Sequence, residues 1–374
     1  MGSRLAILLA AGGACLVGCG SRTGLDFFGK AATDSGGLAD ATGGSSFGSS
    51  DSGSTRGIAR GSLPPSCVNA GDGRTNCGSS NDDCCTSLEV TGGTFFRTYP
   101  NPGNNATGFT DSATVSTFRL DKYLVTVGRF RQFVNAWNNG KGYTPPAGSG
   151  KHTHLNGGKG LNATTGGYEP GWLAADDGDI APTDGNLACN YSGNTWTSTA
   201  STQENLPINC ANWWESYAFC IWDGGFLPSE AEWEYAAAGG SEQREFPWGS
   251  AMPGTACPGT GCQYAIYNCY YPNGSGMCSG PRTENIAAVG AAALGAGLWG
   301  HFDLVGEVYE WELDAYAPFA ACTDCAYVDA AGNRVLRGGC FWDGLADLLP
   351  PYRGYSYPPR DRGSNMGFRC ARPP

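Results

Sequence analysis

The chain has few basic residues, few histidines and no long hydrophobic run beyond its N-terminus. It carries 23 Lys and Arg against 34 Asp and Glu, for a formal net charge of −11. This deficit of positive charge argues against a nucleic-acid partner, because phosphates bind to a basic surface. The apolar stretch GAAALGAGLWG at 290–300 is interrupted by glycine and does not approach the length of a membrane span.

Glycine and aromatic residues are abundant. The 374 residues include 59 Gly, 11 Trp, 17 Tyr and 16 Phe. This combination favours a loop-rich globular fold over a helical bundle. The length suffices for one large domain or two ordinary ones, and the acidic balance indicates a soluble surface.

The first residues have the organisation of a secretory signal. A positive residue precedes a short apolar stretch at 5–17, which is too short for a comfortable membrane span. The ending LVGC resembles a bacterial lipobox and implies cleavage before Cys19 and acylation of its thiol; the alternative is an ordinary signal peptide with a chance cysteine. We predict a lipoprotein signal peptide over 1–18 and a flexible Ser/Gly-rich tether over 19–63. A lipid anchor to the bacterial membrane places the protein in the cell envelope, at the outer membrane and periplasm or at the cell surface.

Seventeen cysteines indicate disulfides, because secreted proteins mature in oxidising compartments. Removing Cys15 in the signal and Cys19 at the lipid site leaves 15, an odd number, so at least one thiol has no partner within the chain. Residues 64–90 form a small Cys-rich segment whose four cysteines allow three pairings. Vicinal Cys84 and Cys85 are expected to bond to different partners. A zinc site is the alternative, but the segment has neither a CxxC pair nor a nearby histidine.

The remaining chain, 91–374, is predicted to form one large domain of mixed secondary structure. Two segments, 126–137 and 212–222, carry apolar residues at helical spacing. These positions are Val127, Phe130, Val134 and Trp137 in the first segment, and Trp214, Tyr217, Ala218 and Ile221 in the second. In LPSEAEWEYAAAGG, Ser229 and Glu232 form a capping box and two glycines end the helix. VLRGG and GFRCAR are expected to be short strands.

Several motifs follow one another in a recognisable order. They are GGTFFR (92–97), DKYLVTVGRFRQFV (121–134), PINCANWWESYAFCIWDGGFLPSEAEWEYAAAGG (207–240), FPWG (246–249), GLWGHFDLVGEVYEW (297–311), RVLRGG (334–339) and SNMGFRCAR (364–372). This succession resembles the formylglycine-generating enzyme family, also called sulfatase-modifying factors, over about residues 91–373. The resemblance implies a disulfide-stabilised, loop-rich α+β domain related to C-type lectins, usually with calcium. Family members oxidise a sulfatase cysteine with copper and oxygen, or are iron-dependent sulfoxide synthases, or have no known chemistry, so the family indicates the fold better than the reaction.

The copper site of the formylglycine-forming members consists of two thiols that follow a Gly-Gly-Ser turn. Carried onto this chain, the serine position holds Cys340, and the thiol positions hold Asp343 and Leu348. Neither is a soft ligand suited to Cu(I), so we predict no such copper centre. Cys340 remains a candidate thiol, expected to be free, partly buried and inert because burial raises the thiol pKa. A nearby cation such as Arg337 would have the opposite effect.

An iron centre is not expected either, because such a site needs histidine and carboxylate ligands. The chain has only His152, His154 and His301, and the first two lie in a Gly-rich insert where we expect them in solvent. The sulfoxide synthases place their iron ligands in a helical domain that has no counterpart in this sequence.

Calcium is the ion that the resemblance implies. The ligands that it implies are Asp303 and the backbone oxygens of Leu304, Gly306 and Val308. Glu310 lies nearby, Glu307 replaces the usual asparagine, and Asn268 corresponds to part of a second site. Calcium prefers several oxygen ligands, many of them from the backbone. The alternative is a polar turn without metal.

The resemblance also implies a substrate groove and a disulfide. Arg337, Asn365 and Arg369 map near the groove, where they either contact a peptide or hold structural turns. Cys220 and Cys370 correspond to a pair that is bonded in the family. Closeness in sequence suggests four further pairs, namely Cys257–Cys262, Cys269–Cys278, Cys322–Cys325 and Cys189–Cys210, which leaves Cys340 as the remainder.

These observations predict a secreted, lipid-anchored member of the family whose catalysis is altered because the thiol pair is missing. Such a protein would bind a peptide or another protein, or serve as a structural module at the cell surface. The alternative is a metal- and oxygen-dependent oxidoreductase that acts on cysteine thiols, by formylglycine generation or a related sulfur oxidation.

Overall fold

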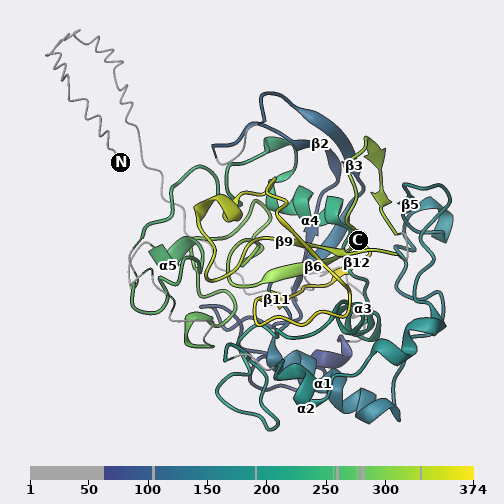
Figure 1. Ribbon diagram of the computed structural model, residues 1–374, viewed down its shortest axis with the longest axis vertical. Coiled ribbons are helices and arrows are strands. Elements are labelled where there is room, and N and C mark those ends of the chain that lie inside the picture. Colours follow the sequence, from purple (N-terminus) through teal and green to yellow (C-terminus); the bar gives the residue numbers. More distant parts are fainter. Residues whose placement is uncertain are drawn as a thin grey trace, which may run out of the picture. The chain divides into compact units, whose positions relative to one another are not determined.

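A computed structural model describes residues 63–102, 106–189, 192–255, 257, 261–274, 276, 278, 283–328 and 331–374 (Figure 1). The predicted signal peptide, the lipidation site Cys19 and all but the last residue of the predicted tether lie outside these ranges. Within them, no helix is both long enough and apolar enough to cross a membrane.

The core is organised around one four-stranded sheet and three smaller ones. The central sheet has the order β10 (Tyr355–Tyr357), β9 (Arg334–Arg337), β6 (Tyr309–Ala315) and β11 (Met366–Gly367). The smaller sheets are β1 (Ser87–Val90), β4 (Phe118–Asp121) and β12 (Ala371–Arg372); β2 (Gly93–Thr98), β3 (Thr110–Val115) and β7 (Cys322–Thr323); and β5 (Asn162–Ala163) with β8 (Cys325–Ala326). Every residue of β6 is buried, and this strand pairs antiparallel with β9 and parallel with β11. The fold is therefore mixed α+β, as predicted.

Three helices pack around these sheets: α1 (Val127–Trp137), α3 (Trp213–Trp222) and α4 (Glu230–Ala237). Two shorter helices, α2 (Asp184–Leu187) and α5 (Gly261–Tyr264), lie in the connections. In Figure 1, α4 lies on one side of β6, and α3 and α1 lie on the other. The three-dimensional core is thus built between α4, the central sheet and the α1–α3 pair.

Helix α4 confirms the start and stop predicted from sequence. Ser229 accepts a hydrogen bond from the Glu232 amide, and the Glu232 carboxylate accepts one from the Ser229 amide, so the capping box is complete. Gly239 follows the helix with φ 66°, a left-handed conformation that glycine adopts without steric strain. Because all these groups lie within a dozen residues, local sequence is enough to specify them.

The buried faces of α1 and α3 match the predicted ones in part: Val127, Phe130 and Trp137, and Tyr217 and Ala218, are buried as predicted. In α1, Phe133 is fully buried while the predicted Val134 is only partly buried. In α3, Trp213 and Phe219 are buried, whereas the predicted Trp214 and Ile221 are only partly buried. Helix α3 is apolar around most of its circumference, so the helical period alone does not select the side that meets the core.

Of the two predicted C-terminal strands, VLRGG is confirmed over its first three residues and GFRCAR only at its two ends. In VLRGG the first three residues belong to β9. The chain then turns sharply at Gly338 and Gly339, whose φ values are 97° and 72°. A Cβ atom at Gly338 would lie 2.8 Å from the carbonyl oxygen of Leu304, so this close approach requires glycine. In GFRCAR only the two ends are strand, as β11 and β12, with Phe368–Cys370 between them in irregular structure.

Seven disulfides staple the described residues, and they include the Cys220–Cys370 bond implied by the resemblance. The others are Cys67–Cys85, Cys77–Cys84, Cys189–Cys210, Cys257–Cys262, Cys269–Cys278 and Cys322–Cys325. Vicinal Cys84 and Cys85 bond to different partners, as predicted. Among the described cysteines, Cys340 is the free one. The one described group of three candidate metal ligands, Cys67, Asp83 and Cys85, has both sulfurs in a disulfide, which leaves no thiolate for zinc.

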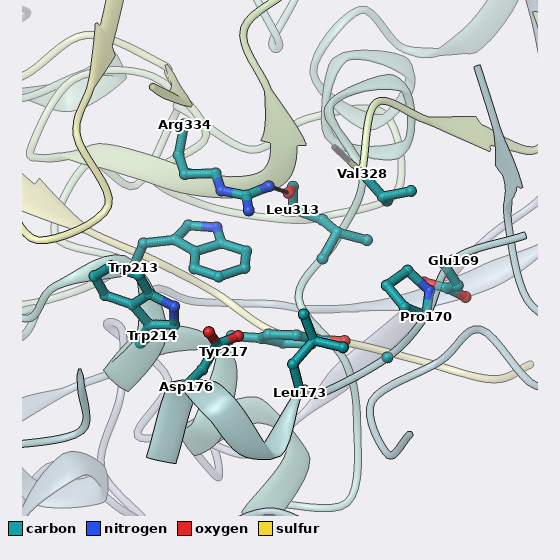
Figure 2. Close-up of a pocket in the computed structure, with 11 residues that line it drawn as sticks. Glu169, Pro170, Leu173, Asp176, Trp213, Trp214, Tyr217, Leu313, Val328 and Arg334 are labelled. Carbon is teal, nitrogen blue, oxygen red and sulfur yellow. Dashed lines mark hydrogen bonds between the residues drawn. The ribbon is translucent and has the colours of Figure 1, made fainter. Parts of the chain in front are cut away.

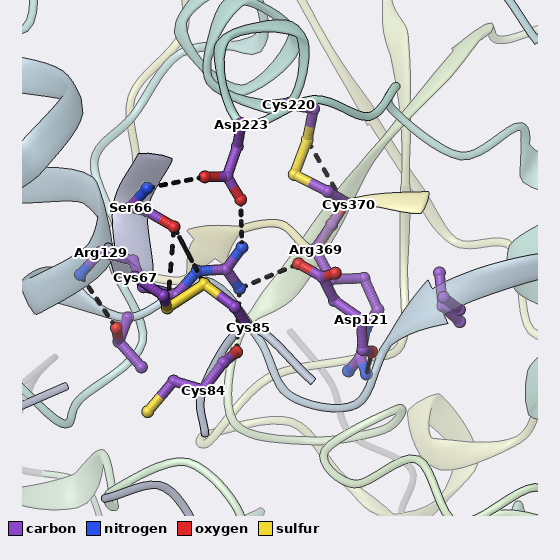
Figure 3. Close-up of polar contacts among 12 residues, drawn as sticks. Ser66, Cys67, Cys84, Cys85, Asp121, Arg129, Cys220, Asp223, Arg369 and Cys370 are labelled. Carbon is purple, nitrogen blue, oxygen red and sulfur yellow. Dashed lines mark hydrogen bonds and ion pairs between the residues drawn. A yellow bond between two sulfur atoms is a disulfide. The ribbon is translucent and has the colours of Figure 1, made fainter. Parts of the chain in front are cut away.

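The Cys-rich segment packs directly against the remaining fold through Arg129 of α1. Its guanidinium donates to Ser66 Oγ at 3.1 Å and to the Cys84 carbonyl at 3.1 Å, both in the segment. It also forms ion pairs with Asp121 at 2.9 Å and Asp223 at 2.7 Å (Figure 3). A single buried side chain therefore joins the segment to α1, to β4 and to the end of α3.

His152 is buried, which corrects the expectation that it is in solvent. Its ring nitrogens lie 3.0 Å from Glu169 Oε1 and 3.0 Å from Glu232 Oε2, and the side chain is 0% exposed. Burial lowers the pKa of His152, but the two carboxylates outweigh it and raise this pKa to about 10. Since Glu232 also caps α4, the charged imidazole fastens the Gly-rich insert to the start of that helix.

This ion pair predicts a loss of stability at alkaline pH. The pKa of His152 is about 10 in the folded state and 6.5 ordinarily, so folding favours the protonated ring. Its contribution is complete below pH 6.5, declines above that value and is lost as the pH rises through 10. Melting temperatures measured from pH 6.5 to 10.5 should fall more steeply for the wild type than for His152→Gln. Parallel curves for the two proteins would contradict this assignment.

Candidate functional site

The turn after β9 forms the wall of the candidate site. The Cys340 amide donates to Asp343 Oδ2 at 2.9 Å, and the Asp343 amide donates back to the Cys340 carbonyl at 3.0 Å. The Phe341 amide donates to the Glu307 carbonyl, which attaches the turn to the loop that precedes β6. A short 3₁₀ turn, Leu345–Leu348, follows. These bonds hold Cys340 and Asp343 in one tight loop.

Cys340 has the properties of an inert thiol. It is 0% exposed, deeper than the partial burial predicted, and burial followed by the charge of Asp343 raises its pKa well above the ordinary value. A hydrogen bond with Asn365 opposes this rise but does not reverse it. Arg337 does not act on it as the sequence allowed, because its guanidinium is engaged elsewhere. A thiol that stays protonated is a weak nucleophile and a weak ligand.

The two positions that correspond to the copper-binding thiols differ in environment. Asp343 is partly buried, and burial raises its pKa. Leu348 is 0% exposed and belongs to the hydrophobic cluster that contains Trp233 and Phe246. Position 343 therefore offers a hard oxygen ligand and position 348 lies in a hydrophobic cluster without a metal ligand, so the pair does not fit a soft copper ion.

A cleft of about 510 Å³ opens beside this turn. Its lining includes Trp342, Tyr357, Asp361, Arg362, Asn365 and Met366. Asn365 is the one predicted groove residue that lies here. The sequence analysis did not identify the remaining lining residues. Most of them lie close in sequence to RGGC or SNMG, and that nearness is the signal that could have found them. Tyr309 is buried behind the turn: it packs against Tyr355 with ring centroids 5.0 Å apart, and burial followed by Asp343 raises its pKa.

Arg337 and Arg369 do not lie in the cleft, which corrects the groove assignment. Both are 0% exposed. Arg337 forms an ion pair with Glu234 at 3.1 Å and donates to the carbonyls of Pro350 and Tyr352. Arg369 pairs with Glu310 at 2.6 Å and donates to the Asp303 carbonyl at 2.8 Å. Buried guanidiniums need several acceptors, and the interior supplies those of both terminal nitrogens of Arg337 and of the whole Arg369 guanidinium, so both arginines brace the fold.

The predicted calcium loop brings two buried carboxylates together. Asp303 and Glu307 both have left-handed backbones, with φ 55° and 65°. Asp303 accepts from the Gly290 amide and Glu307 accepts from the Ala287 amide, each at 2.6 Å, while the second carboxylate oxygen of Glu307 is buried without a hydrogen-bond partner. Burial raises the pKa of Asp303 to about 6, and burial and the nearby Asp303 raise that of Glu307 well above its ordinary value. Two acids that repel each other in the interior are suited to an oxygen-preferring cation.

The other candidate calcium residues are placed less favourably. Glu310 is committed to Arg369 and accepts from the Trp233 indole at 2.9 Å, so its carboxylate is satisfied without an ion. Asn268 lies next to the Cys340 turn, where its backbone amide donates to the Asp343 carbonyl at 2.9 Å. From the sequence, Glu307 was noted only as a replacement for asparagine. In the structure its second carboxylate oxygen is buried without a hydrogen-bond partner, which indicates a cation site.

Comparison with known proteins agrees with these motifs. The model of the sulfatase-modifying factor enzyme 1-like domain matches residues 75–374, which begins inside the Cys-rich segment. The chain is 28% identical to the formylglycine-generating enzyme of Streptomyces coelicolor over 272 residues, covering 68% of this chain and 77% of that enzyme. It is 30% identical over 181 residues to the inactive C-alpha-formylglycine-generating enzyme 2 of Mus musculus, covering 44% of this chain and 49% of that protein.

Two further similarities are more limited. The hercynine oxygenase of Mycolicibacterium smegmatis is 30% identical over 178 residues, which cover 44% of this chain and 37% of that enzyme. The structure of PvdO from Pseudomonas aeruginosa aligns with a TM-score of 0.47 and 19% identity over 77% of this chain and 94% of that one. The chain thus spans half or less of the mouse and mycolicibacterial relatives but about three quarters of the Streptomyces enzyme. The family model covers most of its length, and the chain belongs to the sulfatase-modifying factor enzyme 1-like, or formylglycine-generating enzyme, family.

Proposed function

We propose that this protein is a lipid-anchored binding protein of the bacterial cell envelope that has lost the copper-thiol chemistry of its family. The observation that carries the proposal is the pair of positions 343 and 348. One holds an aspartate and the other a leucine with 0% exposure, while the neighbouring Cys340 is buried with a raised pKa. A family relative whose name includes the word inactive supports the idea that such loss occurs within the family.

The cleft beside Cys340 is the place where a peptide or protein ligand would bind. Its volume of about 510 Å³ is in the range of ligand sites, and it combines the rings of Trp342 and Tyr357 with the polar Asp361 and Asn365. Rigid aromatic surfaces with a few polar groups are typical of recognition sites. The signal-like N-terminus and Cys19 support the lipid anchor. Detergent phase partitioning of the wild type and of Cys19→Ser tests this anchor.

Peptide oxidation distinguishes this proposal from the oxidoreductase alternative. We expect no conversion of the cysteine in a sulfatase-type peptide when the protein is incubated with copper and oxygen, because positions 343 and 348 hold no thiolates to bind the metal. Mass spectrometry of the peptide is the readout, with the Streptomyces coelicolor enzyme as the positive control. The double variant Asp343→Cys, Leu348→Cys restores thiols at both positions and serves as the matched comparison. Conversion by the wild type above the no-protein control would overturn the proposal.

We also propose that calcium binds the loop of Asp303 and Glu307, with the backbone oxygens of Leu304, Gly306 and Val308 as further ligands. The support is the orphaned, buried oxygen of Glu307 beside a second buried acid. A bound ion would offset the repulsion between the carboxylates and fix the loop that carries the Phe341 contact.

Chelation should therefore lower the melting temperature, and added calcium should restore it. At a calcium concentration of 100 times Kd, the stabilisation is about 2.7 kcal/mol. Calorimetric melts in EDTA and in excess calcium measure the effect. Glu307→Gln should reduce it, whereas Glu242→Gln, at a carboxylate that is 53% exposed, should leave it intact. Identical melting temperatures with and without calcium would exclude the site.

A further inference from the structure

A second pocket, separate from the cleft, lies at the N-terminal end of α3. It encloses about 90 Å³ and shares no lining residue with the cleft. Its lining includes three aromatic side chains of α3, Trp213, Trp214 and Tyr217, and also Asp176, Leu173 and Pro170. Figure 2 shows Trp213 and Leu313 on one side of the space and Tyr217 and Leu173 on the other. Neither the family resemblance nor the proposed function assigns any role to this pocket.

The aromatic walls are held rigidly. The Trp213 and Tyr217 rings lie 5.4 Å apart at 45°, and the Trp213 and Trp214 rings lie 6.2 Å apart at 75°. Trp213 donates from its indole to the Glu312 carbonyl at 2.8 Å, and the Tyr217 hydroxyl donates to the Gly150 carbonyl at 3.2 Å. Rings fixed at an angle to one another form a preorganised cage rather than a collapsed stack.

The same helix start brings the acid into position. Asn212, the N-cap of α3, forms a capping box with Glu215 and donates from its side chain to the Asp179 carbonyl at 3.1 Å. This bond holds the 3₁₀ turn Ala174–Asp179, which carries Asp176, beside the aromatic rings. Asp176 also accepts a hydrogen bond from Trp214. The Asn212 bond thus holds the turn, and the Trp214 bond holds Asp176 itself.

The charge around the pocket favours a positive ligand. Two acids line the pocket, Asp176 and Glu169, and Glu169 is paired with His152 at 3.0 Å, which leaves Asp176 as the acid that can meet a ligand. The cation in the lining is Arg334, whose guanidinium stacks 3.9 Å above the Trp213 ring and donates to the Leu313 carbonyl at 3.0 Å. The Trp213 ring thus already accommodates one cation on one face. The charges near this pocket include one positive group, Arg334, and the two carboxylates of Asp176 and Asp179.

We propose that this pocket binds the alkylammonium group of a small organic cation, with its methyl or methylene groups against the rings of Trp213, Trp214 and Tyr217 and its charge beside Asp176. Aromatic faces attract such cations through their quadrupoles, and the attraction grows when water is excluded. The short apolar walls of Leu173 and Pro170 match the alkyl part of such a ligand. This site stands independently of the proposed function, because no residue of the cleft takes part.

Tetramethylammonium chloride is a suitable probe, measured by calorimetry and by tryptophan fluorescence on the purified protein. We expect saturable binding that exceeds that of tert-butanol, a neutral molecule of similar shape, at matched ionic strength. Asp176→Asn and Trp214→Ala should each weaken binding by about tenfold, and neither side chain is fully buried, so the fold should persist. Trp248→Ala removes a tryptophan outside the pocket and should leave the affinity unchanged.

Three results would overturn the proposal. They are the absence of saturable binding, equal affinity for tert-butanol, and unchanged affinity in Asp176→Asn. Equal affinity for tert-butanol would mean that the pocket selects apolar shape and not charge. None of these results bears on the peptide-oxidation test, so the two proposals fail separately.

Discussion

Replacing Arg129 with methionine should lower the free energy of unfolding by about 3–5 kcal/mol. The guanidinium is fully buried, and its removal leaves Asp121 and Asp223, which are 0% and 1% exposed, without their principal cation. Arg372 pairs with the same two carboxylates but is itself partly exposed, so it replaces only part of the lost interaction. Ser66 Oγ and the Cys84 carbonyl lose a donor as well. An uncompensated buried carboxylate is costly because water no longer solvates it.

Urea denaturation followed by tryptophan fluorescence measures this loss. Gln132→Ala is the control, because Gln132 lies on the same helix, is partly exposed and donates only to the Gly128 carbonyl of its own helix. It should change stability by about 0.5 kcal/mol or less. The Arg129 variant should also become sensitive to proteolysis within 64–90, since its side chain joins that segment to α1. A variant as stable as the wild type would show that this ion-pair network contributes nothing net.

Removing the Cys220–Cys370 disulfide should have the second large effect, a loss of about 4–5 kcal/mol in the chain-entropy account. The two cysteines are 150 residues apart, so the bond removes a large amount of freedom from the unfolded chain. Both are 0% exposed and join the last turn of α3 to the segment before β12. The double variant Cys220→Ala, Cys370→Ala, compared with the wild type by denaturant titration, measures the loss.

A short-loop disulfide gives the matched control. Cys322 and Cys325 are only three residues apart, so replacing both with alanine should cost much less than opening the 150-residue loop. The order of the two effects is the critical outcome. If the short-loop variant were destabilised as much as the long-loop variant, loop entropy would not explain the contribution of Cys220–Cys370.

Features encoded by neighbouring residues were predictable from the sequence. Helix α4 begins and ends where Ser229, Glu232 and Gly239 indicate, because caps depend on groups within one or two helical turns. The odd cysteine count, the short spacings and the Cys220–Cys370 pair implied by the resemblance indicated Cys340 as the remaining thiol, and it is free in the structure. The motif order indicated the family, and the substitutions at 343 and 348 were visible as soon as the RGG turn was placed.

Features that depend on what packs against a residue were not predictable. The family resemblance mapped Arg337 and Arg369 near a groove, yet Glu234 and Glu310, distant in sequence, neutralise them in the interior. His152 lies in a Gly-rich insert, yet Glu169 and Glu232 enclose it. The sequence shows that such charges exist, but it does not show which opposite charge meets each of them.

By itself, the sequence determined the family, the mixed α+β class, the local helix signals and the absence of a thiol pair at positions 343 and 348. Only the tertiary structure decided which pairing the Cys-rich segment adopts, which charged side chains lie inside, and that Trp213, Trp214 and Tyr217 meet Asp176 in one pocket. The physical reason is the distance along the chain between the residues that interact. Caps, turns and metal-ligand types are properties of adjacent residues, whereas burial and charge compensation depend on contacts between segments that folding brings together from far apart in the chain.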